Sequence, residues 1–168
     1  MADTASISRR RILYSLALLP GGAMARSLDA APHFVARTLD GERLTSDSLK
    51  GKVVLIEFWA TWCTYCKKDE PAVEKIVREF AKDGLVVLAV DMGEPKRKVK
   101  KYLENSPRSC KIVLAEDTTL AAICNAQSYP LYVLIDRDGN IAGRQNGSAG
   151  EGALRRFLRR AGLGSEES

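Results

Sequence analysis

The sequence predicts an α/β fold in which helices flank a mixed central sheet. Apolar runs of strand length alternate with longer amphipathic stretches of helical period, which is the pattern of a layered α/β domain. Near the C-terminus, Asp138-Gly139 joins two strand-like runs, and this dipeptide favours a tight hairpin, so the sheet should include antiparallel strands. A chain of 168 residues suits a single domain.

The domain is expected over residues 26–162. It begins with a hairpin region at 33–50, whose turn is Asp40-Gly41, and continues as a core over 51–162. Residues 163–168 form a polar tail. We expect core strands at 53–58, 85–90, 111–114, 131–135 and 141–144. We expect helices at 63–83, 95–105, 117–125 and 151–160.

Residues 1–25 have the pattern of an export signal. Arg9-Arg10-Arg11 precedes an apolar run at 12–19, and Ala23-Met24-Ala25 matches a small-x-small cleavage site. The paired arginines resemble a twin-arginine signal, although a plain secretory signal also begins with basic residues. We therefore expect a periplasmic or otherwise extracytoplasmic protein cleaved near Ala25. The alternative is a cytosolic tail with incidental arginines.

The net charge of the chain does not require a nucleic-acid partner. The excess is only +5, and part of it comes from Arg9-Arg10-Arg11 in the predicted signal. Since no long basic block occurs elsewhere, we expect no nucleic-acid binding.

Two cysteines lie where the strand at 53–58 turns into the next helix. Cys63 and Cys66 are three positions apart, so their thiols share one helical face and can close a disulfide ring. Cys63 falls at the helix N-terminus, where unpaired N–H groups and the helix dipole favour a thiolate. A thiolate is the attacking species in disulfide exchange. We therefore expect Cys63 to be the nucleophile and Cys66 the resolving thiol.

A structural zinc site is the alternative interpretation of this pair. Zinc would need two further ligands. The remaining candidates are Cys110, Cys124 and His33, and they form no second close pair. The redox interpretation is therefore preferred, and we expect no metal site.

The residues around the cysteines resemble the thioredoxin superfamily. They are most similar to the extracytoplasmic thiol–disulfide oxidoreductases of the TlpA/ResA type. The likeness runs from about residue 51 to about residue 158, and the stretches that carry it are Phe58-Trp59-Ala60-Thr61-Trp62-Cys63, Cys66-Lys67-Lys68, Pro71 and Tyr129-Pro130.

The resemblance implies a thioredoxin-like fold with an extra N-terminal β-hairpin. It also implies a monomeric enzyme that reduces protein disulfides, as in cytochrome c maturation or metal-centre assembly. Its partners would be protein thiols and disulfides, together with a membrane electron-transfer reductase as electron donor. The enzyme would need no cofactor beyond its own dithiol.

Tyr129-Pro130 is expected to face the disulfide. Only about one X-Pro bond in twenty is cis in folded proteins, so composition alone does not indicate a cis bond. The resemblance does, because family members carry a cis-proline there. The backbone of Tyr129 would then pair with an extended substrate segment, and Trp62 would contact the substrate. The alternative is a trans proline that merely starts a strand.

Two acids are candidates for moving the proton of Cys66. Glu57 interrupts an apolar strand and matches the buried acid of thioredoxins; burial would raise its pKa. Its alternative is a side chain turned toward solvent. Asp69 lies three residues after Cys66, where ResA-like members carry an acid, although it is one methylene shorter than the expected Glu. Its alternative is an ordinary surface acid of the helix.

Cys110 and Cys124 leave two interpretations open. Four strand steps after Cys110 advance about 13 Å, and a helix over 117–124 returns about 11 Å. The two cysteines therefore end at similar heights, which permits a structural disulfide but does not establish one. Two inert buried thiols are the alternative.

Two other functions fit the cysteine pair. A periplasmic disulfide oxidant or isomerase would use the same residues, and Thr64-Tyr65 between the cysteines does not decide the direction of electron flow. A copper-binding thioredoxin-like protein would use Cys63 and Cys66 as soft ligands, but the mature chain is poor in His and Met.

Overall fold

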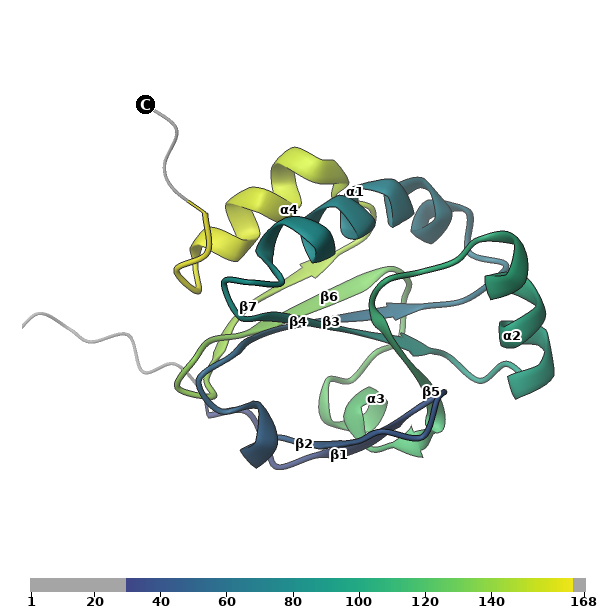
Figure 1. Cartoon of the computed structure of the whole chain (residues 1–168), viewed down its shortest axis with the longest axis horizontal. Helices are drawn as coiled ribbons and strands as arrows, with labels where there is room; N and C mark the ends of the chain where they lie inside the picture. Colours follow the sequence, from purple (N-terminus) through teal and green to yellow (C-terminus); the bar gives the residue numbers. More distant parts are fainter. Residues whose placement is uncertain (1–29, 165–168) are drawn as a thin grey trace, which may run out of the picture.

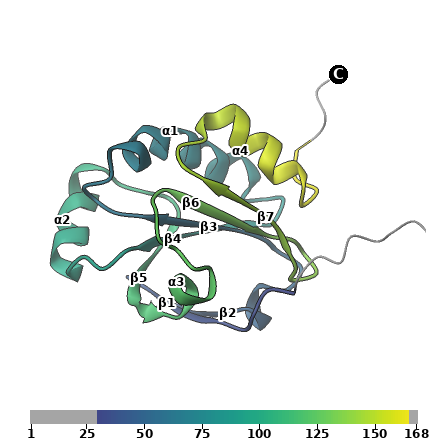
Figure 2. The same ribbon diagram turned by 180° about the vertical axis from the view of Figure 1, so that it is seen from behind.

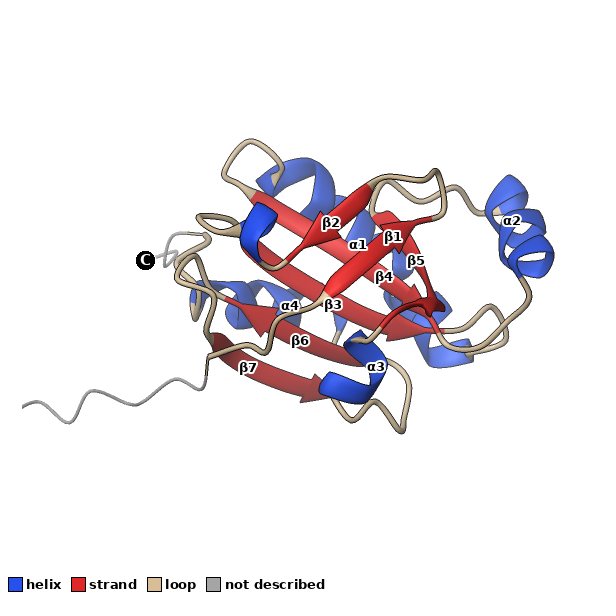
Figure 3. Ribbon diagram, turned by 90° about the horizontal axis from the view of Figure 1, so that it is seen from below, coloured by secondary structure: helices blue, strands red, loops and turns tan. Residues whose placement is uncertain are grey.

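The computed structural model describes residues 30–164 and shows a seven-stranded mixed sheet with helices on both faces. The strand order is β2-β1-β5-β4-β3-β6-β7, which can be followed in Figure 3. The strands are β1 (Val35–Thr38), β2 (Arg43–Thr45), β3 (Val53–Trp59), β4 (Leu85–Asp91), β5 (Lys111–Thr118), β6 (Leu131–Ile135) and β7 (Ile141–Asn146). The helices are α1 (Thr64–Phe80), α2 (Lys96–Asn105), α3 (Leu120–Ile123) and α4 (Gly150–Arg159), and a 3-10 turn, η1, spans Asp47–Leu49. The predicted mixed α/β fold is confirmed.

β3 is the central strand that leads to the cysteines. β4 pairs with it in parallel on one side, and β6 pairs with it antiparallel on the other. All of its residues are buried, because a hydrophobic core covers each face of the sheet. A continuous apolar run is the pattern of a strand that is covered on both faces. At its carboxyl end Trp59 lies beside Asp91, the last residue of β4. The segment that carries the cysteines therefore starts at the carboxyl edge of the sheet.

Each face of the sheet has its own core. On one face α1 and α4 lie side by side (Figure 1), and their apolar side chains join Val99 of α2, Leu55 and Trp59 in a core that includes Cys63 and Cys66. On the other face lie α3 and the β1–β2 hairpin (Figure 2). Their apolar side chains share a core with Val54, Ile56 and Phe58 of β3. The predicted N-terminal hairpin is present, with β1 antiparallel to β2.

Two neighbouring elements, β5 and α3, differ most from the sequence prediction. β5 extends to Thr118 rather than ending at residue 114, and α3 is only Leu120–Ile123 rather than 117–125. The cause is a long-range pairing: β1 pairs antiparallel with β5, and Thr118 Oγ1 donates a hydrogen bond to the Val35 carbonyl. Asn125, with a φ of 46°, follows the short helix in a left-handed conformation.

Some sequence predictions lie outside the described residues. The predicted signal at 1–25 belongs to that group, as do residues 26–29 of the domain and 165–168 of the tail. Among residues 30–164, no helix combines the length and apolar character needed to cross a membrane.

Candidate redox-active site

Cys63 and Cys66 form a disulfide at the N-terminus of α1. Cys63 is the N-cap residue, and its Sγ accepts a hydrogen bond from the Cys66 backbone N–H at 3.1 Å. Cys63 is 5% exposed, whereas Cys66 is fully buried. Of the two sulfurs, a substrate can therefore reach that of Cys63 first. This agrees with the predicted order of nucleophile and resolving thiol.

The same geometry stabilises a negative charge on Cys63 once the disulfide is reduced. A donor N–H already points at this sulfur, and the unpaired N–H groups of the first helical turn add the positive end of the helix dipole. Thiolates at helix N-termini are favoured for this reason. The site is thus suited to nucleophilic attack on a disulfide.

Exposed aromatic side chains lie next to both cysteines in the chain. Trp62 is 61% exposed and Tyr65 is 65% exposed, although most large apolar side chains among residues 30–164 are buried. The Trp62 ring lies edge-on to the Tyr129 ring at 6.2 Å, which brings the Tyr129-Pro130 segment to the cysteine loop. The predicted cis peptide bond between Tyr129 and Pro130 is confirmed. The structure therefore brings together the sequence-predicted residues Trp62, Tyr129 and Pro130.

Glu57 is buried and is paired with a residue that the sequence analysis did not identify. It lies on the face of β3 that carries Leu55 and Trp59, so the alternative of a solvent-facing side chain is wrong. Arg108 Nη2 donates to Glu57 Oε2 at 2.5 Å, and the Arg108 side chain is 1% exposed. The Arg108 guanidinium also stacks over the Trp59 ring at 5.0 Å. A buried carboxylate calls for a cation, but the chain has many, and no local pattern distinguishes Arg108.

Burial raises the pKa of Glu57, and the charge and hydrogen bond of Arg108 oppose that rise. Four polar atoms in this cluster have no hydrogen-bond partner: Glu57 Oε1, Trp59 Nε1, and Nε and Nη1 of Arg108. Unpartnered buried groups of this kind occur where an internal water binds or where the group has a functional role. The structure thus leaves one oxygen of Glu57 free to accept a proton.

Asp69 is also buried, but its two oxygens are occupied. They accept hydrogen bonds from Tyr132 Oη at 3.0 Å, Ser148 Oγ at 2.6 Å, and the backbone N–H groups of Ala149 and Gly150. The last two belong to the start of α4, where a carboxylate satisfies unpaired N–H groups. Asp69 is therefore not a surface acid. Its contacts favour a role in holding α4 against α1, and a catalytic role stays a prediction.

Two further acids near the site, Asp91 and Glu94, were also not predicted from the sequence. Glu94 accepts hydrogen bonds from the backbone N–H and the hydroxyl of Thr61, two residues before Cys63. The signal that could have revealed it is an acid directly after a buried strand, at the edge where the cysteine loop starts.

Cys110 and Cys124 are free thiols, so the structural disulfide that the sequence permitted is not formed. Cys110 packs with the core on the α1 face, whereas Cys124 packs with the core on the α3 face. Similar heights along the sheet did not reveal that the two side chains lie on opposite faces. Burial raises the pKa of Cys110 to about 12 and also raises the pKa of Cys124.

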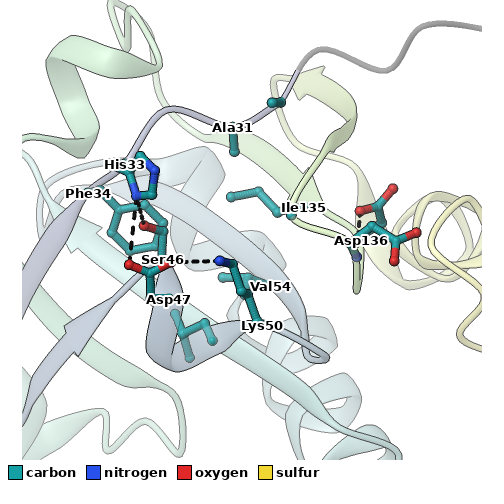
Figure 4. Close-up of a pocket in the computed structure, with 13 residues that line it drawn as sticks. Ala31, His33, Phe34, Ser46, Asp47, Lys50, Val54, Ile135 and Asp136 are labelled. Atoms are coloured by element: carbon teal, nitrogen blue, oxygen red, sulfur yellow. Dashed lines mark hydrogen bonds and ion pairs between the residues drawn. The ribbon is translucent and has the colours of Figure 1, made fainter.

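An apolar pocket lies at the other end of β3 from the disulfide. It has a volume of about 180 Å³, and Phe34, Val54 and Ile135 line it (Figure 4). At its rim Lys50 and Asp47 form an ion pair at 2.9 Å. The pocket contains no cysteine and is separate from the redox site. Among residues 30–164, no three His, Cys, Asp or Glu side chains are grouped to hold a metal ion.

Comparison with known proteins agrees with this site. The model of the AhpC/TSA family matches residues 28–144. The chain is 28% identical over 136 residues to the thiol-disulfide oxidoreductase ResA of Halalkalibacterium halodurans, covering 81% of this chain and 77% of that protein. It is 35% identical over 114 residues to the thioredoxin-like protein YneN of Bacillus subtilis, covering 66% of each.

Solved structures give the same answer for the fold. A thiol:disulfide interchange protein of the thioredoxin family from Chlorobium tepidum superposes with a TM-score of 0.72 at 27% identity, covering 83% of this chain and 99% of that one. The predicted thioredoxin-like fold and the predicted likeness to ResA-type oxidoreductases are thus confirmed. The chain belongs to the AhpC/TSA family.

Proposed function

We propose that this protein is an exported thiol–disulfide oxidoreductase that reduces disulfides in protein substrates. The observation that carries the proposal is the Cys63–Cys66 disulfide at the N-terminus of α1, beside exposed aromatic residues and a cis-proline. The similarity to ResA proteins supports the same reaction class.

The reaction proceeds in two exchange steps. The Cys63 thiolate attacks one sulfur of the substrate disulfide, which forms a mixed disulfide and releases the other substrate sulfur as a thiolate. Cys66 then loses its proton and attacks the Cys63 sulfur. The Cys63–Cys66 disulfide forms, and the second substrate sulfur leaves. Two electrons have then passed to the substrate, whose two thiolates take up protons.

Glu57 is the proposed acceptor of the Cys66 proton. Its free Oε1 and its pKa, which burial raises, suit a base that must take a proton inside the protein. Arg108 fixes the other oxygen, so the carboxylate is held in one orientation. Asp69 is the second candidate, but its four hydrogen bonds make it the weaker one.

Substrate binding is assigned to Trp62, Tyr129 and Pro130. Proline has no N–H, so Pro130 would present an apolar, non-donating surface to the sulfurs. An extended substrate segment would pair with the backbone of Tyr129, while its side chains contact the exposed Trp62 ring.

The cellular role is proposed from the ResA-type likeness and the sequence. The protein would act outside the cytoplasm as a monomeric reductant, in cytochrome c maturation or metal-centre assembly. A membrane electron-transfer reductase would return electrons to the cysteine pair. The protein's own dithiol would be its only redox group.

Trapping the mixed disulfide tests this function. Reduced Cys66→Ser protein, mixed with a disulfide-containing protein, should accumulate a covalent adduct that dithiothreitol releases, because the resolving thiol is absent. Cys63→Ser protein should form no adduct and should not reduce the substrate. Substrate reduction by Cys63→Ser at the wild-type rate would refute the assignment.

A further inference from the structure

The carboxyl end of β4 carries two acids that are tied to each other and to the cysteine loop. Asp91 Oδ1 accepts a hydrogen bond from the Glu94 backbone N–H at 3.0 Å. Glu94 Oε1 accepts from Thr61 Oγ1 at 2.8 Å, and Glu94 Oε2 accepts from the Thr61 backbone N–H at 2.5 Å. Both carboxylate oxygens of Glu94 therefore accept hydrogen bonds from Thr61, a residue of the loop that leads to Cys63.

The hydrogen bonds between Glu94 and Thr61 affect the position of Cys63. The Cys63 backbone N–H bonds to the Ala60 carbonyl at 3.0 Å, so residues 60–63 form one tight turn with Thr61 inside it. The Met92 N–H bonds to the Trp59 carbonyl at 3.0 Å and anchors the start of this turn to the residue after Asp91. A change in the position of Glu94 would therefore shift this turn and the position of the Cys63 sulfur.

Asp91 Oδ1 is held on the Glu94 backbone N–H, and the negative charge of the nearby Glu94 carboxylate disfavours ionisation of Asp91. Asp91 is fully buried, and its Oδ2 has no hydrogen-bond partner. Glu94 is also buried, but Lys98 Nζ lies 2.6 Å from its Oε1. Adjacent carboxyl groups with unequal surroundings separate into one that ionises readily and one that keeps its proton.

The charges that face Asp91 point to it as the group that keeps the proton. They are Glu94 in the following turn and Lys98 on α2. Its register partners on β3 and β5, Trp59 and Leu114, are uncharged. Burial raises the pKa of Asp91 to about 7; the Glu94 carboxyl group reinforces this rise, and the Glu94 backbone N–H and Lys98 oppose it. Burial also disfavours ionisation of Glu94, but its bonds to Lys98 and Thr61 outweigh this and lower its pKa to about 2.

We propose that Asp91 keeps its proton beside the ionised Glu94 in the resting enzyme, and that this state keeps Glu94 in place on Thr61 and so positions Cys63. Asp91 is a positioning residue, because it acts through Glu94 and Thr61 and touches no reacting atom in the described geometry. Loss of the Asp91 proton leaves two adjacent negative charges. Their repulsion weakens the hydrogen bonds between Glu94 and Thr61 and makes the attack of Cys63 on the substrate disulfide less favourable.

The proposal deepens the proposed function and rests on it for its effect on rate, but its structural part can be tested separately. In the oxidised protein neither Cys63 nor Cys66 titrates. The chemical shift of the Thr61 amide is then followed by NMR from about pH 5 to about pH 9. We expect one titration step with a midpoint near pH 7, as the pKa of Asp91 indicates. This step should vanish in Asp91→Asn, whose amide keeps the shape but cannot ionise.

Two further variants keep the test decisive. Asp138→Asn replaces an exposed acid at the β6–β7 turn and should leave the Thr61 step unchanged. Glu94→Gln can still bond to Thr61 but removes the like charge, so the midpoint should fall by about one pH unit. A Thr61 amide that does not titrate in the wild type, or a step near pH 7 that persists in Asp91→Asn, would overturn the proposal.

The rate arm compares disulfide exchange by the reduced proteins. Taking the ratio of Asp91→Asn to wild type cancels the common titration of Cys63. We expect a ratio near one at about pH 6 that rises to about threefold at about pH 8. A ratio that stays constant with pH, while both proteins remain active, would refute the positioning role and leave the cysteine chemistry intact. Inactivity of both proteins at every pH would instead contradict the proposed function.

Discussion

Replacing Arg108 with Met tests the buried ion pair beside the redox site. Arg108 and Glu57 are both almost completely buried, and their contact is 2.5 Å. Removing one partner of such a pair leaves an uncompensated buried charge, which typically costs about 3–5 kcal/mol. Because Met keeps an apolar contact with Trp59, the loss should come mainly from the charge. We expect the free energy of unfolding of the oxidised protein to fall by about 3 kcal/mol at neutral pH.

The assay is urea unfolding followed by tryptophan fluorescence, with a matched control at an exposed pair. Arg155 bonds to Glu79 and Glu151, but the three side chains are 28%, 42% and 37% exposed, so Arg155→Met should cost no more than about 1 kcal/mol. The double variant Glu57→Gln, Arg108→Met should be more stable than Arg108→Met alone, because the unpaired carboxylate is gone. A coupling energy of about 2 kcal/mol is expected.

The pH dependence of this variant has a defined sign. The pKa of Glu57 is raised in the folded protein, and loss of the opposing cation raises it further. A carboxyl group with a raised pKa destabilises the folded state as pH rises toward that pKa. The stability loss of Arg108→Met should therefore be larger at about pH 8 than at about pH 5. An equal loss at both pH values, or a loss no greater than that of Arg155→Met, would refute the buried-pair account.

Two other predictions concern the acids and the remaining thiols. In single-turnover reduction, Glu57→Gln should slow resolution of the mixed disulfide by about 100-fold near neutral pH, because the proton acceptor is lost. Asp69→Asn should keep the wild-type rate. It should instead lower the free energy of unfolding by about 1–2 kcal/mol, because its contacts to α4 are weaker. Equal single-turnover rates for Glu57→Gln and wild type across pH would remove Glu57 from the mechanism. The remaining thiols are tested by alkylating the oxidised protein in denaturant without reductant and measuring its intact mass. Cys110 and Cys124 should be labelled, and no other cysteine. The native protein should resist labelling near pH 8, because burial raises the pKa of both thiols. A denatured protein that takes up no label would restore the bridge between them.

Local sequence patterns were sufficient to predict the strand, the cysteine pair and the helix that form the redox site. The apolar run of β3, the cysteine spacing and the helical period after it all act within a few residues, so the strand, the disulfide and α1 follow from sequence. The cis bond at Tyr129-Pro130 followed from family resemblance, since about nineteen in twenty such bonds are trans.

Contacts between distant segments account for what the sequence did not reveal. Arg108 reaches Glu57 across 51 positions, and Glu94 reaches Thr61 across 33. No periodicity encodes either pair. The length of β5 was underestimated for the same reason, because its last residues become strand only through pairing with β1.

The reduction potential of the Cys63–Cys66 pair tests the central claim most directly. It is best measured in Cys110→Ala, Cys124→Ala protein, by equilibrium with glutathione or dithiothreitol buffers, so that only one couple responds. A reductant of protein disulfides should have a potential near about −250 mV or lower. A potential above roughly −150 mV would mean that the reduced form is the more stable one, and it would make the protein an oxidant.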